Sequence, residues 1–169
     1  MLSTPGEGSR FWADLPLAAA AQRSVEAPSR FAPVDALQGA RILLVEDHPV
    51  NTLVAEATLA HWGALVVTAG NGELAVRAVA EASTRGEPFD AVLMDLQMPV
   101  LGGIDATIAI RREHGALALP VIALTADALV AQCENALRHG MNDISKPIDP
   151  ERLVRVLAHW VRRSRAARR

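Results

Sequence analysis

Acidic side chains, a threonine and a lysine follow short apolar segments at four separate points of the chain. These residues are Glu46, Asp47, Asp95, Thr125 and Lys146. Three carboxylates that converge repel one another, and a divalent cation relieves that repulsion. Hard oxygen ligands that leave room for water and a phosphate describe a magnesium site, while a lysine and a hydroxyl can hold phosphate oxygens. A carboxylate beside bound Mg²⁺ can attack phosphorus, so the set predicts an aspartyl phosphate.

Lys146 is distinctive because the chain otherwise uses arginine for positive charge. It is the single lysine among 17 basic residues. Its compact ammonium group makes contacts that a planar guanidinium cannot imitate. The bond from Lys146 to Pro147 can be cis, which would turn the lysine inward. The alternative to a phosphate-binding role is chance composition.

Apolar segments alternate with helical patterns between residues 41 and 163. Continuous apolar segments predict five short strands, at 41–45, 64–69, 91–94, 121–124 and 141–145. Helical spacing predicts five helices, at 49–62, 72–83, 104–114, 126–139 and 150–163. Such alternation predicts an α/β fold, a doubly wound five-stranded parallel sheet with helices on both faces. The candidate residues then share the carboxyl edge of the sheet, where functional groups collect.

Length and composition bound the class of protein. The chain has 169 residues, of which 50% are hydrophobic and 21% charged, enough for a packed core. It contains no apolar run of the roughly 18 residues that span a bilayer, and no secretory signal pattern at its start. A single cysteine, Cys133, excludes an internal disulfide framework and a cysteine-based zinc site. We therefore expect a cytoplasmic protein without membrane contact.

The formal net charge of -2 conceals an uneven distribution. Residues 162–169 hold five arginines and no acid, so the rest of the chain is more acidic than the total indicates. An acidic body lacks the basic face of a nucleic-acid-binding protein, and we expect no nucleic-acid partner. We interpret the arginine-rich run as a frayed helix end; weak contact with phosphates is the alternative.

Four motifs together resemble the receiver domain of response regulators in two-component signalling. They are VEDHPVN at 45–51, MDLQMPVLGG at 94–103, ALTA at 123–126 and SKPID at 145–149. The residues of these motifs are most similar to those of the C-terminal receivers of hybrid sensor histidine kinases. The resemblance spans about residues 40–162 and implies the flavodoxin-like receiver fold.

The resemblance implies a metal site built from four residues. Asp47 would bind Mg²⁺ directly, and Glu46 would act through water. The backbone carbonyl of Gln97, two residues past Asp95, would complete the protein ligands together with the Asp95 carboxylate. Mg²⁺ is thus the expected cofactor.

The resemblance also implies the signalling chemistry. Asp95 would be the phosphoacceptor, Thr125 the switch hydroxyl and Lys146 the ammonium that contacts the phosphate. The phosphoryl group would come from a phosphohistidine of a histidine kinase. It would then pass to water or to a histidine phosphotransfer protein.

The segment before Lys146 departs from the family pattern. The chain reads GMNDISKP at 140–147, one residue shorter than usual. The missing position usually holds an aromatic residue or histidine coupled to the switch threonine, and this chain contains no tyrosine. Either Asp143 takes that place or the strand is shortened. In both cases the usual relay from threonine to aromatic ring is not expected in its common form.

The first residues show a second resemblance, to the closing hairpin of the ATP-binding domain of histidine kinases. It is carried by STPGEGSRFWADLPL at 3–17. We therefore expect a kinase-domain remnant at 1–17, a linker at 18–39, the receiver at 40–163 and a basic tail at 164–169. Because the ATP-binding parts and the phosphorylated histidine helix are not in this sequence, we expect a signalling phosphoacceptor without kinase activity.

Two other functions stay open from the sequence. A phosphatase of the haloacid dehalogenase type also uses an aspartate nucleophile with Mg²⁺, but it carries a second aspartate two residues later. Here that position is Gln97, which cannot donate a catalytic proton. The other alternative is a non-switching, receiver-like docking module. The intact Asp47, Asp95, Thr125 and Lys146 argue against it, and the shortened segment before Lys146 argues for it.

Overall fold

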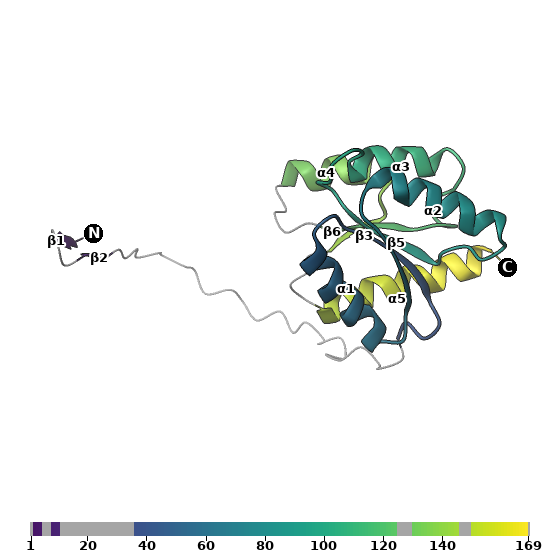
Figure 1. Cartoon of the computed structure of the whole chain (residues 1–169), viewed down its shortest axis with the longest axis horizontal. Helices are drawn as coiled ribbons and strands as arrows, with labels where there is room; N and C mark the ends of the chain where they lie inside the picture. The colour runs from purple at the N-terminus through teal and green to yellow at the C-terminus, as the bar shows by residue number, and fades with distance from the viewer. Residues whose placement is uncertain (1, 5–7, 11–35, 125–129, 146–149, 169) are drawn as a thin grey trace, which may run out of the picture. The chain divides into compact units, whose positions relative to one another are not determined.

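The computed structural model of the chain describes residues 2–4, 8–10, 36–124, 130–145 and 150–168 (Figure 1). It divides into two units, Met1–Arg30 and Phe31–Arg169. In the first unit, β1 (Leu2–Thr4) pairs antiparallel with β2 (Gly8–Arg10). A hairpin was expected in this region, but its descent from a kinase domain stays a prediction.

The second unit is built on one five-stranded sheet. Its strands are β3 (Arg41–Val45), β4 (Leu65–Ala69), β5 (Ala91–Asp95), β6 (Val121–Leu124) and β7 (Asp143–Ser145). All neighbouring strands run parallel, in the order β4-β3-β5-β6-β7. The chain therefore reverses its direction of winding between β3 and β5, which confirms the predicted doubly wound sheet.

Helices cover both faces of this sheet. They are α1 (Pro49–His61), α2 (Gly72–Thr84), α3 (Gly103–Arg111), α4 (Val130–Arg138) and α5 (Pro150–Ala167). Figure 1 shows α2, α3 and α4 on one side of the sheet and α1 and α5 on the other. None of the helices in the described ranges is both long and apolar enough to cross a membrane.

Strand β3, which lies between β4 and β5, shows why the apolar segments are continuous. Ile42 and Leu44 enter the hydrophobic cluster beneath α1 and α5, whereas Leu43 and Val45 enter the cluster beneath α2 and α3. All four side chains are fully buried. Because both faces of the strand are covered, no polar residue alternates with the apolar ones.

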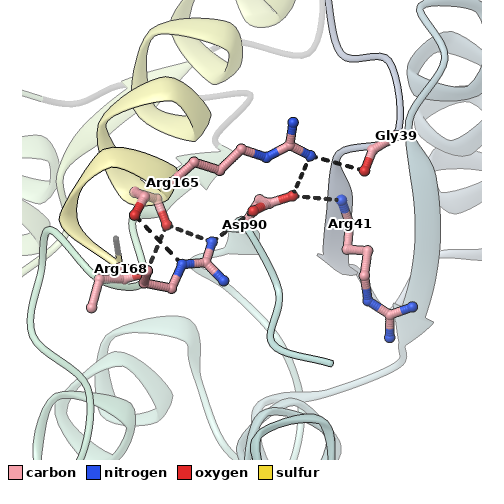
Figure 2. A network of polar contacts seen from close by, with 7 residues as sticks. Gly39, Arg41, Asp90, Arg165 and Arg168 are labelled. Atoms are coloured by element: carbon pink, nitrogen blue, oxygen red, sulfur yellow. Dashed lines mark hydrogen bonds and ion pairs between the residues drawn. The ribbon is translucent and has the colours of Figure 1, made fainter. Parts of the chain in front are cut away.

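The last helix differs from its prediction. It was expected to end at residue 163, but α5 continues to Ala167. Figure 2 shows that Arg165 in this added turn and Arg168 just after it reach back to Asp90, the residue before β5. The interpretation of this run as a frayed helix end is therefore wrong as far as Arg168, because two of its arginines have specific partners.

Asp90 is the centre of this network at the amino edge of the sheet. Its Oδ2 accepts hydrogen bonds from Arg165 Nη2 at 2.8 Å and from the Arg41 backbone N–H at 3.0 Å. Its Oδ1 accepts one from Arg168 Nη2 at 2.6 Å, and Arg165 also donates to the Gly39 carbonyl at 2.9 Å. Burial alone would raise the pKa of Asp90, but these hydrogen bonds and the two guanidinium charges lower it below its ordinary value.

Candidate functional site

Three of the predicted site residues meet at the carboxyl edge of the sheet. Carboxylate oxygens of Glu46, Asp47 and Asp95 lie within 4.8 Å of one another. Glu46 and Asp47 directly follow β3, and Asp95 is the last residue of β5. Since β3 and β5 are parallel neighbours, with Val45 opposite Met94, their carboxyl ends bring the three acids together. This confirms the predicted convergence of these side chains.

Glu46 is held firmly at the end of β3. Its backbone N–H donates to the Ala69 carbonyl at 3.1 Å, which extends the pairing with β4 by one residue. Glu46 is only 9% exposed to solvent. Its Oε1 accepts hydrogen bonds from the His48 backbone N–H at 3.2 Å and from Asn51 Nδ2 at 3.0 Å. Asn51 lies in the first turn of α1 and was not among the predicted site residues.

Asp95 is half-buried beside Asp47. Burial raises the pKa of Asp95, a hydrogen bond from the Gln97 backbone N–H opposes this, and the negative charge of Asp47 raises the pKa further. The Gln97 nitrogen lies 3.1 Å from Asp95 Oδ1. Among the described residues, burial and the neighbouring Asp47 thus outweigh the hydrogen bond from Gln97 in setting the pKa of Asp95.

Gly103 allows α3 to begin close to Asp95. Its N–H donates to the Leu96 carbonyl at 3.2 Å, which closes the loop after β5. A Cβ atom on Gly103 would overlap the Asp95 carbonyl oxygen. Only glycine therefore permits α3 to begin this close to the backbone of Asp95.

The acidic cluster fits a divalent cation. Within the described residues, none of the ion pairs involves Glu46, Asp47 or Asp95. Three oxygen donors with few competing cations match the preferences of a hard cation such as Mg²⁺. Glu46, Asp47 and Asp95 are therefore the residues that can hold a metal here.

The structure describes Gln97 but not the other predicted site residues, Thr125 and Lys146. Thr125, Lys146 and the Lys146–Pro147 bond lie outside the described residues. Gln97 is placed beside Asp95 through its backbone N–H, and the metal-binding role of its carbonyl stays a prediction.

The shortened segment before Lys146 forms the three-residue strand β7. Asp143 begins it opposite Ile122 of β6. The Asp143 Oδ2 accepts a hydrogen bond from the Trp160 indole of α5 at 3.3 Å. The guanidinium of Arg163 lies over the Trp160 ring, 5.5 Å from its centroid. An acidic side chain tied to α5 thus stands three residues before Lys146.

Arg111 and Asn142, which were not predicted from the sequence, form a polar network between α3 and the loops before β6 and β7. Arg111 donates to the carbonyls of Gly140 at 2.9 Å and Leu119 at 2.8 Å, and to Asn142 Oδ1 at 2.9 Å. Asn142 Oδ1 also accepts from the Val121 backbone N–H at 2.9 Å. Burial lowers the pKa of Arg111 to about 10. These contacts join α3 to the starts of β6 and β7. The spacing of residues in the sequence does not predict them.

Comparison with known proteins identifies the same part of the chain. The profile of the response regulator receiver domain matches residues 42–158. Sensor protein GacS of Pseudomonas syringae pv. syringae is 41% identical over 124 residues, which cover 71% of this chain and 13% of that protein. Two-component response regulator ORR41 of Oryza sativa subsp. japonica is 42% identical over 124 residues, which cover 71% of this chain and 93% of that protein.

Solved receiver structures have the same fold. The receiver domain of sensor histidine kinase PA1611 from Pseudomonas aeruginosa PAO1, with a magnesium ion in its active site cleft, is 43% identical, with a TM-score of 0.65. The match covers 73% of this chain and 98% of that one. The receiver domain of histidine kinase CKI1 from Arabidopsis thaliana, complexed with Mg²⁺ and BeF₃⁻, is 26% identical, with a TM-score of 0.64. The match covers 77% of this chain and 96% of the CKI1 receiver chain.

These matches agree with the geometry of the sheet and its acidic edge. The matched family profile covers most of the chain, and ORR41 is matched over nearly its whole length. The matched segment of GacS is a small share of that sensor. This chain belongs to the response regulator receiver domain family.

Proposed function

We propose that the chain is a phosphoacceptor in a two-component phosphorelay and that Asp95 receives the phosphoryl group. The observation that carries this proposal is the convergence of Glu46, Asp47 and Asp95, whose carboxylate oxygens lie within 4.8 Å of one another. Asp95 stands at the end of a buried strand, next to a loop that glycine allows to pack closely. A nucleophile fixed in this way needs little reorganisation before reaction.

The proposed reaction transfers a phosphoryl group between two side chains. An oxygen of the Asp95 carboxylate forms a bond to phosphorus while the phosphorus–nitrogen bond of a donor phosphohistidine breaks. The electron pair of that bond stays on the imidazole nitrogen, and the product is an aspartyl phosphate. Attack by water, or by a histidine of a phosphotransfer protein, would later release the phosphoryl group and restore the carboxylate.

The roles of the surrounding residues follow from the donor set. Asp47 would bind Mg²⁺ directly and Glu46 through water, with the Gln97 carbonyl as a further ligand. Bound Mg²⁺ would offset the carboxylate charges and the charge of the phosphoryl oxygens. Thr125 and Lys146 would contact the phosphoryl oxygens through a hydroxyl and an ammonium group.

Relatives support the choice of metal and of reaction. The PA1611 receiver holds a magnesium ion in its active site cleft, and the CKI1 receiver was solved with Mg²⁺ and BeF₃⁻. Histidine kinases or histidine phosphotransfer proteins are the partners that this chemistry requires. The receiver-domain profile and the match to nearly the whole of the response regulator ORR41 also favour a signalling module over a kinase.

The test is incubation of the full chain with Mg²⁺ and acetyl phosphate, followed by intact mass spectrometry. We expect the parent chain to gain one phosphoryl group and Asp95→Asn to gain none. Asp105→Asn is a matched control, because Asp105 is an exposed carboxylate of α3 that lies outside the acidic cluster. Equal phosphorylation of the parent and Asp95→Asn would overturn the proposal.

A docking module that does not switch is the second candidate. The observation that favours it is the three-residue β7, in which Asp143 bonds to Trp160 of α5. If this bond holds β7 against α5 in every state, Trp160 fluorescence will not change when Asp95 is phosphorylated. A clear fluorescence change in the parent, absent in Asp95→Asn, would contradict the docking-only function.

A further inference from the structure

Asn51 contacts the metal-site residue Glu46 from the first turn of α1. Its Nδ2 donates to Glu46 Oε1 at 3.0 Å, and the His48 backbone N–H donates to the same oxygen at 3.2 Å. We propose that Asn51 is a positioning residue for the metal site, which holds the Glu46 carboxylate so that its other oxygen, Oε2, serves the cation. This inference rests on the proposed function, in which Glu46, Asp47 and Asp95 share a Mg²⁺ ion.

Because Glu46 is buried, the orientation of its carboxylate depends on hydrogen bonds from the protein. Glu46 is 9% exposed, so water can do little to solvate or orient its carboxylate. An ionised group in that position needs hydrogen bonds from the protein. Asn51 is exposed, and its amide could be satisfied by water without contacting the protein. Its contact with Glu46 therefore matters more to Glu46 than to Asn51.

A neutral donor suits a carboxylate that has to serve a cation. An arginine or lysine in the place of Asn51 would cancel the charge of Glu46 and compete with a metal ion. An amide fixes the direction of the carboxylate and leaves its full negative charge to the site. Asp90 shows the other arrangement, because Arg165 and Arg168 neutralise it in place.

Two hydrogen bonds to one oxygen also restrict rotation of the Glu46 side chain. Groups that orient a metal ligand in this way commonly change metal affinity when they are removed. The competing explanation is that Asn51 merely stabilises the start of α1, whose N-cap residue His48 makes no side-chain capping bond. Such a structural role would change stability without changing metal affinity.

The test measures Mg²⁺ affinity of the full chain by calorimetry, with Mn²⁺ titration by electron paramagnetic resonance as a second readout. Asn51→Leu keeps the shape of the side chain but removes the donor, and we expect it to weaken binding about tenfold. The matched control is Thr52→Val, because Thr52 Oγ1 bonds only to the carbonyls of Glu46 and His48 among its described contacts. It should leave metal affinity unchanged.

A double-mutant cycle separates positioning from a structural role. If Asn51 acts through the Glu46 carboxylate, Asn51→Leu will have little further effect on Mg²⁺ affinity in the Glu46→Gln background. An unchanged affinity in Asn51→Leu, or an equal loss in both backgrounds, would overturn the inference. Failure of the parent chain to bind Mg²⁺ or Mn²⁺ would instead overturn the metal step of the proposed function, and this inference with it.

Discussion

Strand β5 places an aspartate at each of its ends, and the two aspartates have opposite surroundings. Asp90, just before the strand, receives two guanidinium groups and a backbone N–H, and its pKa is lowered. Asp95, its last residue, faces Glu46 and Asp47, and its pKa is raised. Two arginines thus neutralise the carboxylate at the amino edge, whereas none of the ion pairs among the described residues involves the three acids at the carboxyl edge.

The difference separates a structural carboxylate, Asp90, from the carboxylate that we propose as the phosphoacceptor, Asp95. The Asp90 carboxylate accepts hydrogen bonds from Arg165 and from the Arg41 backbone N–H, and so joins the start of β5 to α5 and to β3 (Figure 2). At Asp95 we expect repulsion from Asp47 to cost some stability and to favour binding of a metal ion. Both residues precede or end the same buried strand, so burial alone does not decide between the two roles.

The largest expected effect comes from making the same substitution at the two ends of β5. Asp90→Asn leaves Arg165 and Arg168 without their carboxylate, and Arg168 is only 25% exposed. We expect a loss of about 2 kcal/mol in the free energy of unfolding, less than for a fully buried pair because both arginines reach solvent. Asp95→Asn without metal relieves repulsion and should leave stability equal or slightly higher. Urea unfolding of both variants checks this.

The proposed difference between the two ends of β5 is contradicted if Asp90→Asn and Asp95→Asn lower the free energy of unfolding equally. A double variant, Arg165→Gln with Arg168→Gln, is the control for Asp90. It should be destabilised by a similar amount to Asp90→Asn, because it breaks the same contacts from the other side. Mg²⁺ should stabilise this double variant as it does the parent, since the amino edge is remote from the acidic cluster in the sheet.

The pH dependence of stability should report the lowered pKa of Asp90. A carboxyl group with a lowered pKa in the folded state stabilises the fold fully above its ordinary pKa of 3.8. That stabilisation is lost as the pH falls through the lower, folded-state value. The gap between the parent and Asp90→Asn should therefore be widest near neutral pH and narrow below pH 3.8. A gap that stays constant into this acidic range would show that Asp90 is not held by charge.

The strands and the acidic cluster could be predicted because they depend on local pattern. The bounds of β3 and β6 agree with the predicted 41–45 and 121–124, since strands buried on both faces are continuously apolar. Glu46, Asp47 and Asp95 could be placed together because parallel strands end at one edge. Thr125 and Lys146, outside the described residues, stay predictions on the same argument.

Contacts between distant or polar residues could not be predicted in this way. Arg165 lies 75 residues from Asp90 in the chain, and an arginine-rich run has the composition of a solvated end. Arg111 satisfies backbone carbonyls of loops, which leave no periodic signal. Asn51 is exposed, and only its distance to Glu46 distinguishes it from any polar residue of a helix.

The smallest expected effect concerns backbone strain at the two edges of the sheet. At the amino edge, Gly39 adopts a φ of 64°, which glycine permits without cost. At the carboxyl edge the loop after Asp95 places Val100 at a φ of 70°, although its side chain is β-branched and the residue is 77% exposed. Strain of this kind often accompanies functional loops.

Val100→Asn should therefore stabilise the fold by about 0.5–1 kcal/mol, because asparagine tolerates the left-handed region without the added chain entropy of glycine. Thermal unfolding of the metal-free chain measures this gain. Val50→Asn is the control, since Val50 is also exposed (61%) but lies in helix α1 with ordinary backbone angles. It should give no gain, because asparagine is no better than valine in a helix. An equal gain in both variants would attribute the effect to lost surface hydrophobicity, whereas a gain confined to Val100 would locate stored strain in the loop that follows Asp95.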